Sequence, residues 1–248
     1  MYSPQARRSA LADLAVGRTL SAVSRRSGVS RSALREWSEA SATELRTLRS
    51  ACPRDRPIAQ APYAHLLGLY LGDGSISSGA RGVFALRISC DAKYPALVAE
   101  CVESMSLVSE RRVSLVSAPG CAVVKSYSRH WPCLFPQHGD GLKHDRVIAL
   151  STWQSDAVVA HPESLVRGLF HSDGCRVINW TVRRVAGATK RYEYPRYLFS
   201  NESEDILGIC EWALDLLGIR HTRSRRNVIS VARRPDVRLM DVVVGPKR

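Results

Sequence analysis

The apolar positions of the chain form one pattern twice. Leu66–Gly74 and Val166–Gly174 lie 100 residues apart, and each predicts an apolar helix that ends in Asp-Gly. The small residues on these helices recur at a spacing of four: Gly68 and Gly72 in the first, and Gly168 and Ser172 in the second. Because residues four apart share one face of a helix, we expect the two helices to pack along these residues with their backbones close together.

The segments that follow the two helices also correspond. Alternating apolar and polar residues predict strands at Val83–Ser89 and Tyr194–Ser200, followed by helices that end near Met105 and near Leu217. Further short strands are expected at Val113–Val116, Cys121–Tyr127, His221–Arg223 and Val228–Val231. Each half then ends in another helix and a Gly-x-Lys sequence, which indicates that one supersecondary unit has been duplicated.

The acidic ends of the repeated helices are the candidate site. Packing of the two helices would place Asp73 and Asp173 at the same end of the pair. Two carboxylates that close together cannot both stay ionised without a partner, and a divalent cation with oxygen ligands supplies one. The structural alternative is that Asp-Gly only ends each helix. Repetition of the whole unit favours a composite metal site at a pseudo-twofold axis.

The hairpin after the second helix is longer than that after the first. Sixteen residues separate Asp73 from Ser89, whereas 27 separate Asp173 from Ser200. The insertion is basic and includes Arg183, Arg184, Lys190 and Arg191. It is either a solvent-exposed hairpin tip or a long ribbon that follows a phosphate backbone.

The paired motifs, with the order of elements around them, resemble the signature helices of the LAGLIDADG homing endonucleases in their single-chain, two-motif form. The resemblance covers roughly residues 60–248. It implies an α+β fold, in which tandem pseudo-twofold repeats of the αββαββ type form a DNA-binding saddle. The motif helices would form the interface between the halves, and the sheets would place strands in the major groove.

The same resemblance implies hydrolysis of one phosphodiester on each DNA strand, with Mg²⁺ as the cofactor. Asp73 and Asp173 match the metal-binding catalytic acids of the family, and the carbonyls of Gly72 and Ser172 would bind the same ions.

Lys143 and Lys247, from the two Gly-x-Lys sequences, match the basic residues that the family places near the scissile phosphates. The sixth motif position, acidic in the family's name, holds Leu71 in one half and His171 in the other. His171 is either a helix-face histidine satisfied by a neighbour or a group that tunes the metal or contacts phosphate. Some members keep the scaffold without cleavage and regulate transcription, and this is the alternative function.

The first 60 residues predict a small all-α module. Helices are expected at Ser9–Val16, Leu20–Arg26 and Arg31–Ser38, with Thr19 and Ser30 as N-caps and Gly28 after the second helix. This arrangement resembles a helix-turn-helix module, in which Arg31, Ser32 and Arg35 would face DNA. A helical cap without DNA contacts is the alternative.

The net charge of +13 lies at the two ends of the chain. Residues 1–60 carry +6 and residues 220–248 carry +7, whereas the residues between them balance. This distribution favours two contacts with a polyanion, and the second would include Arg223, Arg225 and Arg226. We therefore expect binding to double-stranded DNA that weakens steeply with salt.

The composition also bears on whether the chain is a membrane protein, a secreted protein or a zinc protein. No stretch approaches the roughly 18 apolar residues that a membrane span needs, and the first residues lack a secretory signal. The seven cysteines are scattered without a Cys-x-x-Cys, which favours reduced thiols over structural zinc or a disulfide framework. We expect a cytoplasmic, bacterial nucleoid-associated monomer with internal pseudo-twofold symmetry.

Four segments follow from these patterns: a helix-turn-helix domain at 1–50, a linker at 51–60, the first repeat at 61–160 and the second at 161–248. Three functions compete. They are a Mg²⁺-dependent DNA endonuclease, a transcription regulator on the same scaffold, and a glycosidase that uses two carboxylates. The basic ends disfavour the glycosidase. Plasmid cleavage with Mg²⁺ against EDTA separates the first two.

Overall fold

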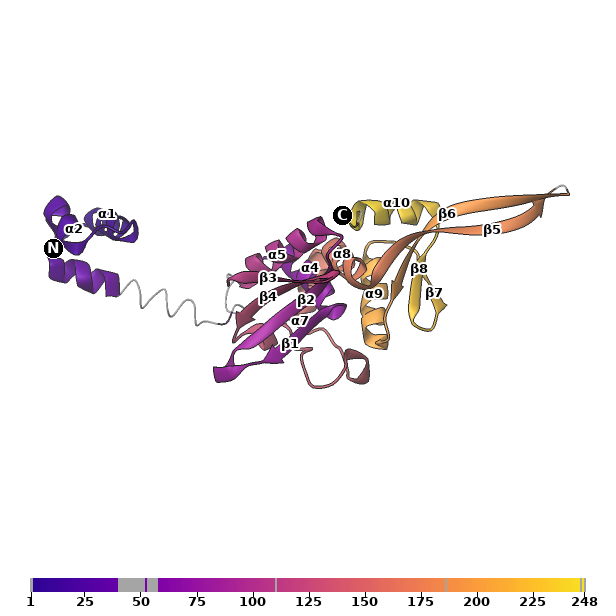
Figure 1. The fold of residues 1–248 in the computed structure, drawn as a ribbon, viewed down its shortest axis with the longest axis horizontal. Coiled ribbons are helices and arrows are strands. Elements are labelled where there is room, and N and C mark those ends of the chain that lie inside the picture. Colours follow the sequence, from indigo (N-terminus) through magenta and orange to yellow (C-terminus); the bar gives the residue numbers. More distant parts are fainter. Residues whose placement is uncertain are drawn as a thin grey trace. The chain divides into compact units, whose positions relative to one another are not determined.

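A computed structural model describes residues 2–39, 52, 58–109, 111–185, 187–245 and 247. The contacts between residues divide the chain into two compact units, Met1–Asp55 and Arg56–Arg248 (Figure 1). Each unit has its own hydrophobic core. The predicted linker at 51–60 lies largely outside the described residues, and Gln60 already belongs to the first helix of the second unit.

The described residues of the first unit form three short helical segments. They are α1 (Pro4–Ala15), α2 (Leu20–Ser27) and the helical residues 31–39. The Thr19 hydroxyl caps α2 by accepting from the N–H of Ala22 at 3.3 Å, and Gly28 ends the helix at a φ of 68°. The core of this unit consists of Ala10, Val23, Val29 and Leu34.

The first helix begins earlier than the sequence pattern predicts, at Pro4 instead of Ser9. The apolar periodicity starts at Ser9, but capping decides where the helix begins. The Ser3 hydroxyl accepts from the N–H of Ala6 at 3.1 Å, and Pro4 suits the first helical position because it has no N–H to satisfy.

The second unit contains two repeats with the same order of elements. The first repeat comprises α4 (Gln60–Leu71), β1 (Gly74–Ser78), β2 (Phe84–Asp91), α5 (Pro95–Ser109), β3 (Val113–Ala118), β4 (Cys121–Ser128) and α6 (Trp131–Leu134). The second comprises α8 (Pro162–Asp173), β5 (Gly174–Val185), β6 (Ala188–Ser200), α9 (Glu204–Leu216), β7 (Thr222–Arg225), β8 (Val228–Val231) and α10 (Arg234–Val243). No helix among the described residues is long and apolar enough to cross a membrane.

Each repeat forms one four-stranded antiparallel sheet. The strand orders are β1-β2-β4-β3 and β5-β6-β8-β7, so corresponding strands occupy corresponding places. The predicted mixed helix-and-sheet fold with tandem repeats is therefore confirmed. The short 3₁₀ helices Ala80–Gly82 and Lys143–Asp145 lie in the connections of the first repeat.

The two hairpins that follow the motif helices differ in length. β5 and β6 pair over twelve positions, from Gly174↔Phe199 to Val185↔Ala188, whereas β1 and β2 pair over five. β6 pairs with β8 only from Tyr197 to Ser200. Most of the β5–β6 hairpin is therefore a two-stranded ribbon that extends away from its sheet (Figure 1).

The motif helices α4 and α8 pack against each other in the centre of the second unit. Gly68 and Gly168 lie at the contact. A Cβ atom on Gly168 would lie 2.2 Å from the carbonyl oxygen of His65 and 3.0 Å from the Cα of Gly68. A Cβ atom on Gly68 would lie 2.5 Å from the carbonyl oxygen of Leu165. The small-residue faces thus allow the close backbone contact that the sequence predicts.

A helix that the sequence analysis missed, α7 (Thr152–Ala160), joins the repeats. Ser151 and Gln154 form a capping box at its start, a pattern visible in the sequence. Gln154 is fully buried, and its side-chain nitrogen donates to the hydroxyl of Tyr63 on α4 at 2.7 Å. This polar contact fixes α7 against the motif helix.

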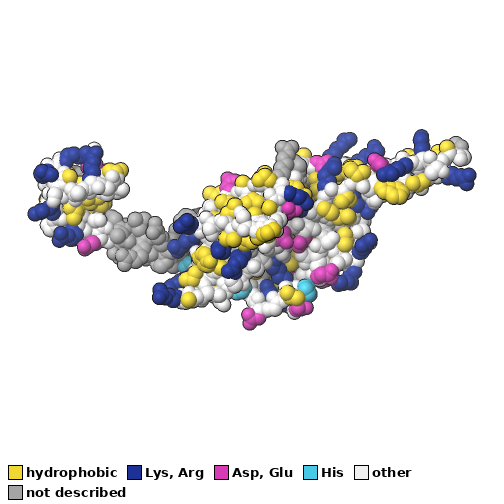
Figure 2. Space-filling model, viewed as in Figure 1, with side chains coloured by type: hydrophobic (Ala, Val, Ile, Leu, Met, Phe, Trp, Pro, Cys, Tyr) yellow, Lys and Arg dark blue, Asp and Glu magenta, His cyan; other side chains and the backbone are white. Residues whose placement is uncertain are grey.

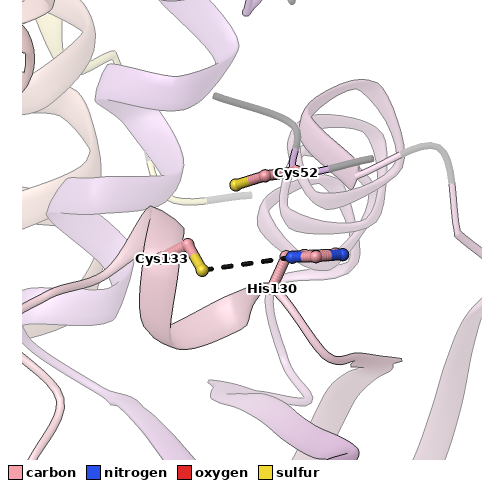
Figure 3. A group of neighbouring side chains, drawn as sticks. All are labelled: Cys52, His130 and Cys133. Carbon is pink, nitrogen blue, oxygen red and sulfur yellow. Dashed lines mark hydrogen bonds between the residues drawn. The ribbon is translucent and has the colours of Figure 1, made fainter. Parts of the chain in front are cut away.

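None of the seven cysteines, all of which lie in the described residues, forms a disulfide. Cys90, Cys101 and Cys210 are buried in the core of the second unit. Cys133 on α6 has its sulfur 4.0 Å from Nδ1 of His130, the residue before the helix (Figure 3).

Candidate functional site

Packing of α4 against α8 brings the ends of the two motifs together. A Cβ atom on Gly72 would lie 2.1 Å from the Ser172 hydroxyl and 3.0 Å from a carboxylate oxygen of Asp173. Asp73 follows Gly72 directly, and the negative charge of Asp173 raises its pKa. Both acids therefore lie at the same end of the helix pair.

The lysines of the two Gly-x-Lys sequences lie at the ends of these helices. Lys143 donates to the carbonyl oxygens of Gly72 at 2.8 Å and Leu71 at 3.0 Å. Lys247 donates to those of Gly174 at 2.6 Å and Ser172 at 3.4 Å. The last carbonyls of a helix have no partner within the helix, and they attract cations. Each lysine thus binds the end of the motif helix of its own repeat.

Two cavities surround this end of the helix pair. One, of about 410 Å³, is lined by Gly72, Lys143, Asp173 and Asn201, among others. The other, of about 200 Å³, is lined by Asp73, Cys90, Ser172 and Lys247, among others. Each cavity therefore combines the aspartate of one repeat with the helix end and the lysine of the other. This exchange is what a pseudo-twofold axis through the helix pair produces.

The two cavities differ in the residue that adjoins the aspartate. Asn201 donates from its amide to the Asp173 carboxylate at 2.7 Å. The corresponding position in the first repeat is Cys90, because Ser89 and Ser200 align. The sequence analysis did not select Asn201, although its place directly after the repeated Ser200 was the available signal. The site is symmetric in its acids and lysines and asymmetric in this neighbour.

The protein shifts the pKa values of both acids upward. Removal of water from around the carboxyl and the charge of Asp173 raise the pKa of Asp73 to about 6, while Lys143 and Lys247 oppose the shift. Desolvation also raises the pKa of Asp173, and the Asn201 hydrogen bond opposes it. Burial lowers the pKa of Lys143 to about 8 and also lowers that of Lys247. Loss of hydration, joined at Asp73 by the charge of Asp173, thus outweighs the nearby lysines.

The raised pKa of Asp73, caused by burial and by the charge of Asp173, predicts a pH dependence of stability in the metal-free protein. The folded state raises the pKa of Asp73 to about 6, so folding favours its protonated form. The stabilisation is fully present below the unfolded pKa, near 4, and is lost as the pH rises through about 6. We expect Tm in EDTA to fall more between pH 4 and pH 7 in the wild type than in Asp73→Asn, as measured by scanning calorimetry. An equal or larger fall of Tm in the variant would show that Asp73 does not cause this pH dependence.

The donor set fits a hard divalent cation. Asp73 and Asp173 supply carboxylate oxygens, which Mg²⁺ and related ions prefer, and the mutual repulsion of the two acids is what a cation would relieve. The carbonyls of Gly72 and Ser172 accept from Lys143 and Lys247, and each keeps a second lone pair. The predicted metal ligands are thus side by side.

The predicted DNA-binding residues are not among those that line these cavities. Arg31, Ser32 and Arg35 are exposed in the first unit, and Arg183, Arg184, Lys190 and Arg191 are exposed on the β5–β6 ribbon. Figure 2 shows Lys and Arg side chains along this ribbon. The ribbon also exposes apolar side chains, since Ile178 is 57% and Trp180 is 55% exposed. Arg191 lies over the Trp180 ring, 4.9 Å from its centroid.

The three arginines of the C-terminal segment differ in their surroundings. Arg223 is held by two acids, with ion pairs to Glu211 at 2.6 Å and to Glu204 at 2.9 Å. Arg226 pairs with Glu202 at 2.8 Å and is largely exposed, and Arg225 is exposed. Sequence reasoning could not separate the structural contacts of Arg223 from DNA contacts, because its acidic partners lie on a different element.

His171 is buried in the last turn of α8 and lines the smaller of the two cavities. It is 5% exposed, and its Nε2 lies 2.9 Å from the carbonyl oxygen of Val244. This contact agrees with a helix-face histidine that a neighbour satisfies.

The arrangement of paired motif helices, two antiparallel sheets and a shared acidic end is the one that the LAGLIDADG resemblance predicts. No protein-family model matches the chain, and no curated protein matches its sequence. Among solved structures, the chain is similar to the LAGLIDADG meganuclease I-AabMI bound to uncleaved DNA, with 12% identity, a TM-score of 0.47 and coverage of 73% of this chain and 82% of that one.

Two further similar structures are I-DmoI in complex with DNA and Ca and the N-terminal LAGLIDADG domain of DUF199/WhiA. The first has 13% identity, a TM-score of 0.45 and coverage of 76% of this chain and 94% of that one. The second has 15% identity, a TM-score of 0.46 and coverage of 76% and 83%. These three similarities each cover about three quarters of this chain.

Proposed function

We propose that the chain binds double-stranded DNA and cleaves one phosphodiester on each strand, with Mg²⁺ as cofactor. The observation that carries the proposal is the pair of cavities, each with an aspartate from one repeat and a lysine from the other. Two such sites related by a pseudo-twofold axis suit a duplex, because its two strands are related by a local twofold axis as well.

In this proposal Asp73 and Asp173 bind the cation, and the carbonyls of Gly72 and Ser172 complete its protein ligands. When bound, Mg²⁺ polarises the phosphate and lowers the pKa of an attacking water. Lys143 and Lys247 place positive charge beside the reacting phosphates, which stabilises the charge that develops on the phosphate oxygens.

The role of Asn201 in the proposed reaction is to orient the Asp173 carboxylate. Its amide donates to one carboxylate oxygen at 2.7 Å and leaves the other oxygen available. The hydrogen bond favours the ionised form of Asp173, which is the form that binds a cation.

The test is selection of cleaved sites from a random duplex library, followed by cleavage of a plasmid that carries the selected site. We expect linear product with Mg²⁺ and none with EDTA. Recovery of bound sites without any cleaved product, with either Mg²⁺ or Mn²⁺, would contradict the nuclease proposal and leave DNA binding.

The β5–β6 ribbon is proposed to contact the DNA backbone. Replacing Arg183, Arg184, Lys190 and Arg191 by glutamine should weaken binding and reduce the slope of log K against log salt by about 3 to 4, since each phosphate contact contributes about 0.9. Fluorescence anisotropy at several salt concentrations measures the slope. An unchanged slope would exclude the ribbon from the interface.

One observation favours a second function, sequence-specific regulation of transcription without cleavage. In the first unit α2 and the helical residues 31–39 are joined around Gly28, and residues 31–39 expose Arg31, Ser32 and Arg35. These features suit a helix-turn-helix, whose second helix reads the major groove. If Arg31→Ala and Arg35→Ala change the selected sequence but no cleaved product forms, this alternative is favoured.

A further inference from the structure

Two histidines and a glutamate from three different helices converge inside the second unit, beside the smaller of the two cavities at the acidic end of the motif helices. They are His65 on α4, Glu100 on α5 and His171 on α8, and their ligand atoms all lie within 4.8 Å of one another. Nδ1 of His171 is 3.7 Å and Nε2 of His65 is 4.0 Å from the same oxygen of Glu100. The histidine rings are nearly perpendicular, with centroids 6.1 Å apart.

Both nitrogens that face Glu100 are buried and have no hydrogen-bond partner. His65 is 7% and His171 is 5% exposed. An unpaired buried polar atom destabilises the folded state, so two of them at one place need an explanation.

The other nitrogen of each ring is occupied. Nε2 of His171 donates to the carbonyl oxygen of Val244 at 2.9 Å, which leaves Nδ1 with a bare lone pair when the ring is neutral. Nδ1 of His65 contacts the Ser104 hydroxyl at 2.8 Å, and donation there leaves Nε2 bare. Burial lowers the pKa of His65 to about 4 and also lowers that of His171, so both rings are neutral near pH 7.

Two lone pairs and a carboxylate oxygen therefore face one small space, and a single bound cation would satisfy both lone pairs beside the carboxylate charge. We propose that His65, Glu100 and His171 bind one transition-metal dication of the Zn²⁺ class. Imidazole nitrogens combined with a carboxylate suit such ions, whereas Mg²⁺ and Ca²⁺ prefer oxygen ligands alone. A metal ligand that donates its second nitrogen to a carbonyl or hydroxyl is the usual arrangement for histidine.

Arg167 orients the carboxylate of this cluster. Its Nε donates to one oxygen of Glu100 at 2.9 Å and its Nη2 to the other at 2.6 Å. Its Nη1 donates at 2.7 Å to the carbonyl of Val244, which also accepts from His171. The positive charge of Arg167 offsets that of Glu100, so we expect weaker binding than at zinc sites built from thiolates.

Metal binding here would join the two repeats. α4 and α5 belong to the first repeat, and α8 belongs to the second. His171 also lines the 200 Å³ cavity, which gives a path from solvent. The site uses its own ligands, because none of the three is one of the acids or lysines of the proposed nuclease site.

The test is titration of the metal-free full-length protein with Co²⁺ and Zn²⁺ in the presence of millimolar Mg²⁺. We expect one Co²⁺ per chain with visible d–d absorption. With Zn²⁺ at about 100 times Kd, Tm should rise by roughly 5–10 °C. His65→Phe and His171→Phe should each weaken Co²⁺ binding by about 10-fold or more. The double variant Asp73→Asn/Asp173→Asn should bind Co²⁺ as the wild type does.

The control is His161→Ala, which removes a histidine outside the cluster and should leave binding unchanged. Because the phenylalanine variants could unfold, X-ray absorption at the zinc edge of the wild type provides a second measurement, with imidazole scattering from two histidines expected. Three results would overturn the proposal. They are no Co²⁺ absorption and no change of Tm in the wild type, binding that survives in both folded phenylalanine variants, and bound zinc without imidazole scattering.

Discussion

Replacing Asp73 or Asp173 by asparagine is expected to reduce DNA cleavage by about 1,000-fold or more. Asparagine keeps the shape of the side chain but removes the charge that would bind the cation, and each aspartate lines a different cavity. Duplex binding should remain measurable, because the proposed DNA contacts lie elsewhere. Single-turnover cleavage and anisotropy on the selected site measure the two effects separately.

Asp156→Asn is the matched control for these variants. Asp156 is an exposed carboxylate on α7, and its replacement should leave cleavage within about twofold. Cleavage that survives in the Asp73→Asn/Asp173→Asn double variant would exclude both residues from the reaction. Loss of duplex binding together with cleavage would indicate that the acids act on the fold instead.

Gly168→Ala is expected to destabilise the second unit by about 3 kcal/mol, which lowers Tm by roughly 6–12 °C. The added Cβ atom would lie 2.2 Å from the carbonyl oxygen of His65, and a backbone atom inside a helix cannot move away without separating α4 from α8. Urea unfolding followed by circular dichroism measures the change.

Gly208→Ala provides the opposite result in the same chain. Gly208 lies inside α9, and a Cβ atom there would meet nothing within 4 Å. Alanine should therefore stabilise the protein by about 1 kcal/mol, the difference in helix propensity. If the two variants changed stability equally, close packing of the motif helices would not explain the effect at Gly168.

Local patterns in the sequence predicted much of the fold. Alternation gives β8 at Val228–Val231, and the caps Thr19 and Gly28 give α2, because these features depend on neighbouring residues alone. Repetition of the motif and of Gly-x-Lys selected the two acids and two lysines that the structure brings together. Features that depend on neighbouring residues, or that the sequence contains twice, can be predicted from the sequence alone.

Features that depend on distant contacts were not accessible. Asn201 gains its importance from one hydrogen bond to Asp173, 28 residues earlier. Glu204 and Glu211 hold Arg223 only once α9 packs beside β7, so a basic residue in a basic segment has a structural role there. The α7 capping box could be found in the sequence, but the buried contact of Gln154 with Tyr63 could not.

The unequal hairpins have a consequence for the DNA target under the proposed function. β5 and β6 pair over twelve positions and β1 and β2 over five, and the extra length is roughly 24 Å at about 3.4 Å per residue. That is about two thirds of a turn of B-form DNA. We therefore expect the protein to protect one arm of the DNA target further from the cut than the other arm. The recognition sequence need not be a palindrome, although the two repeats of the chain share one order of elements.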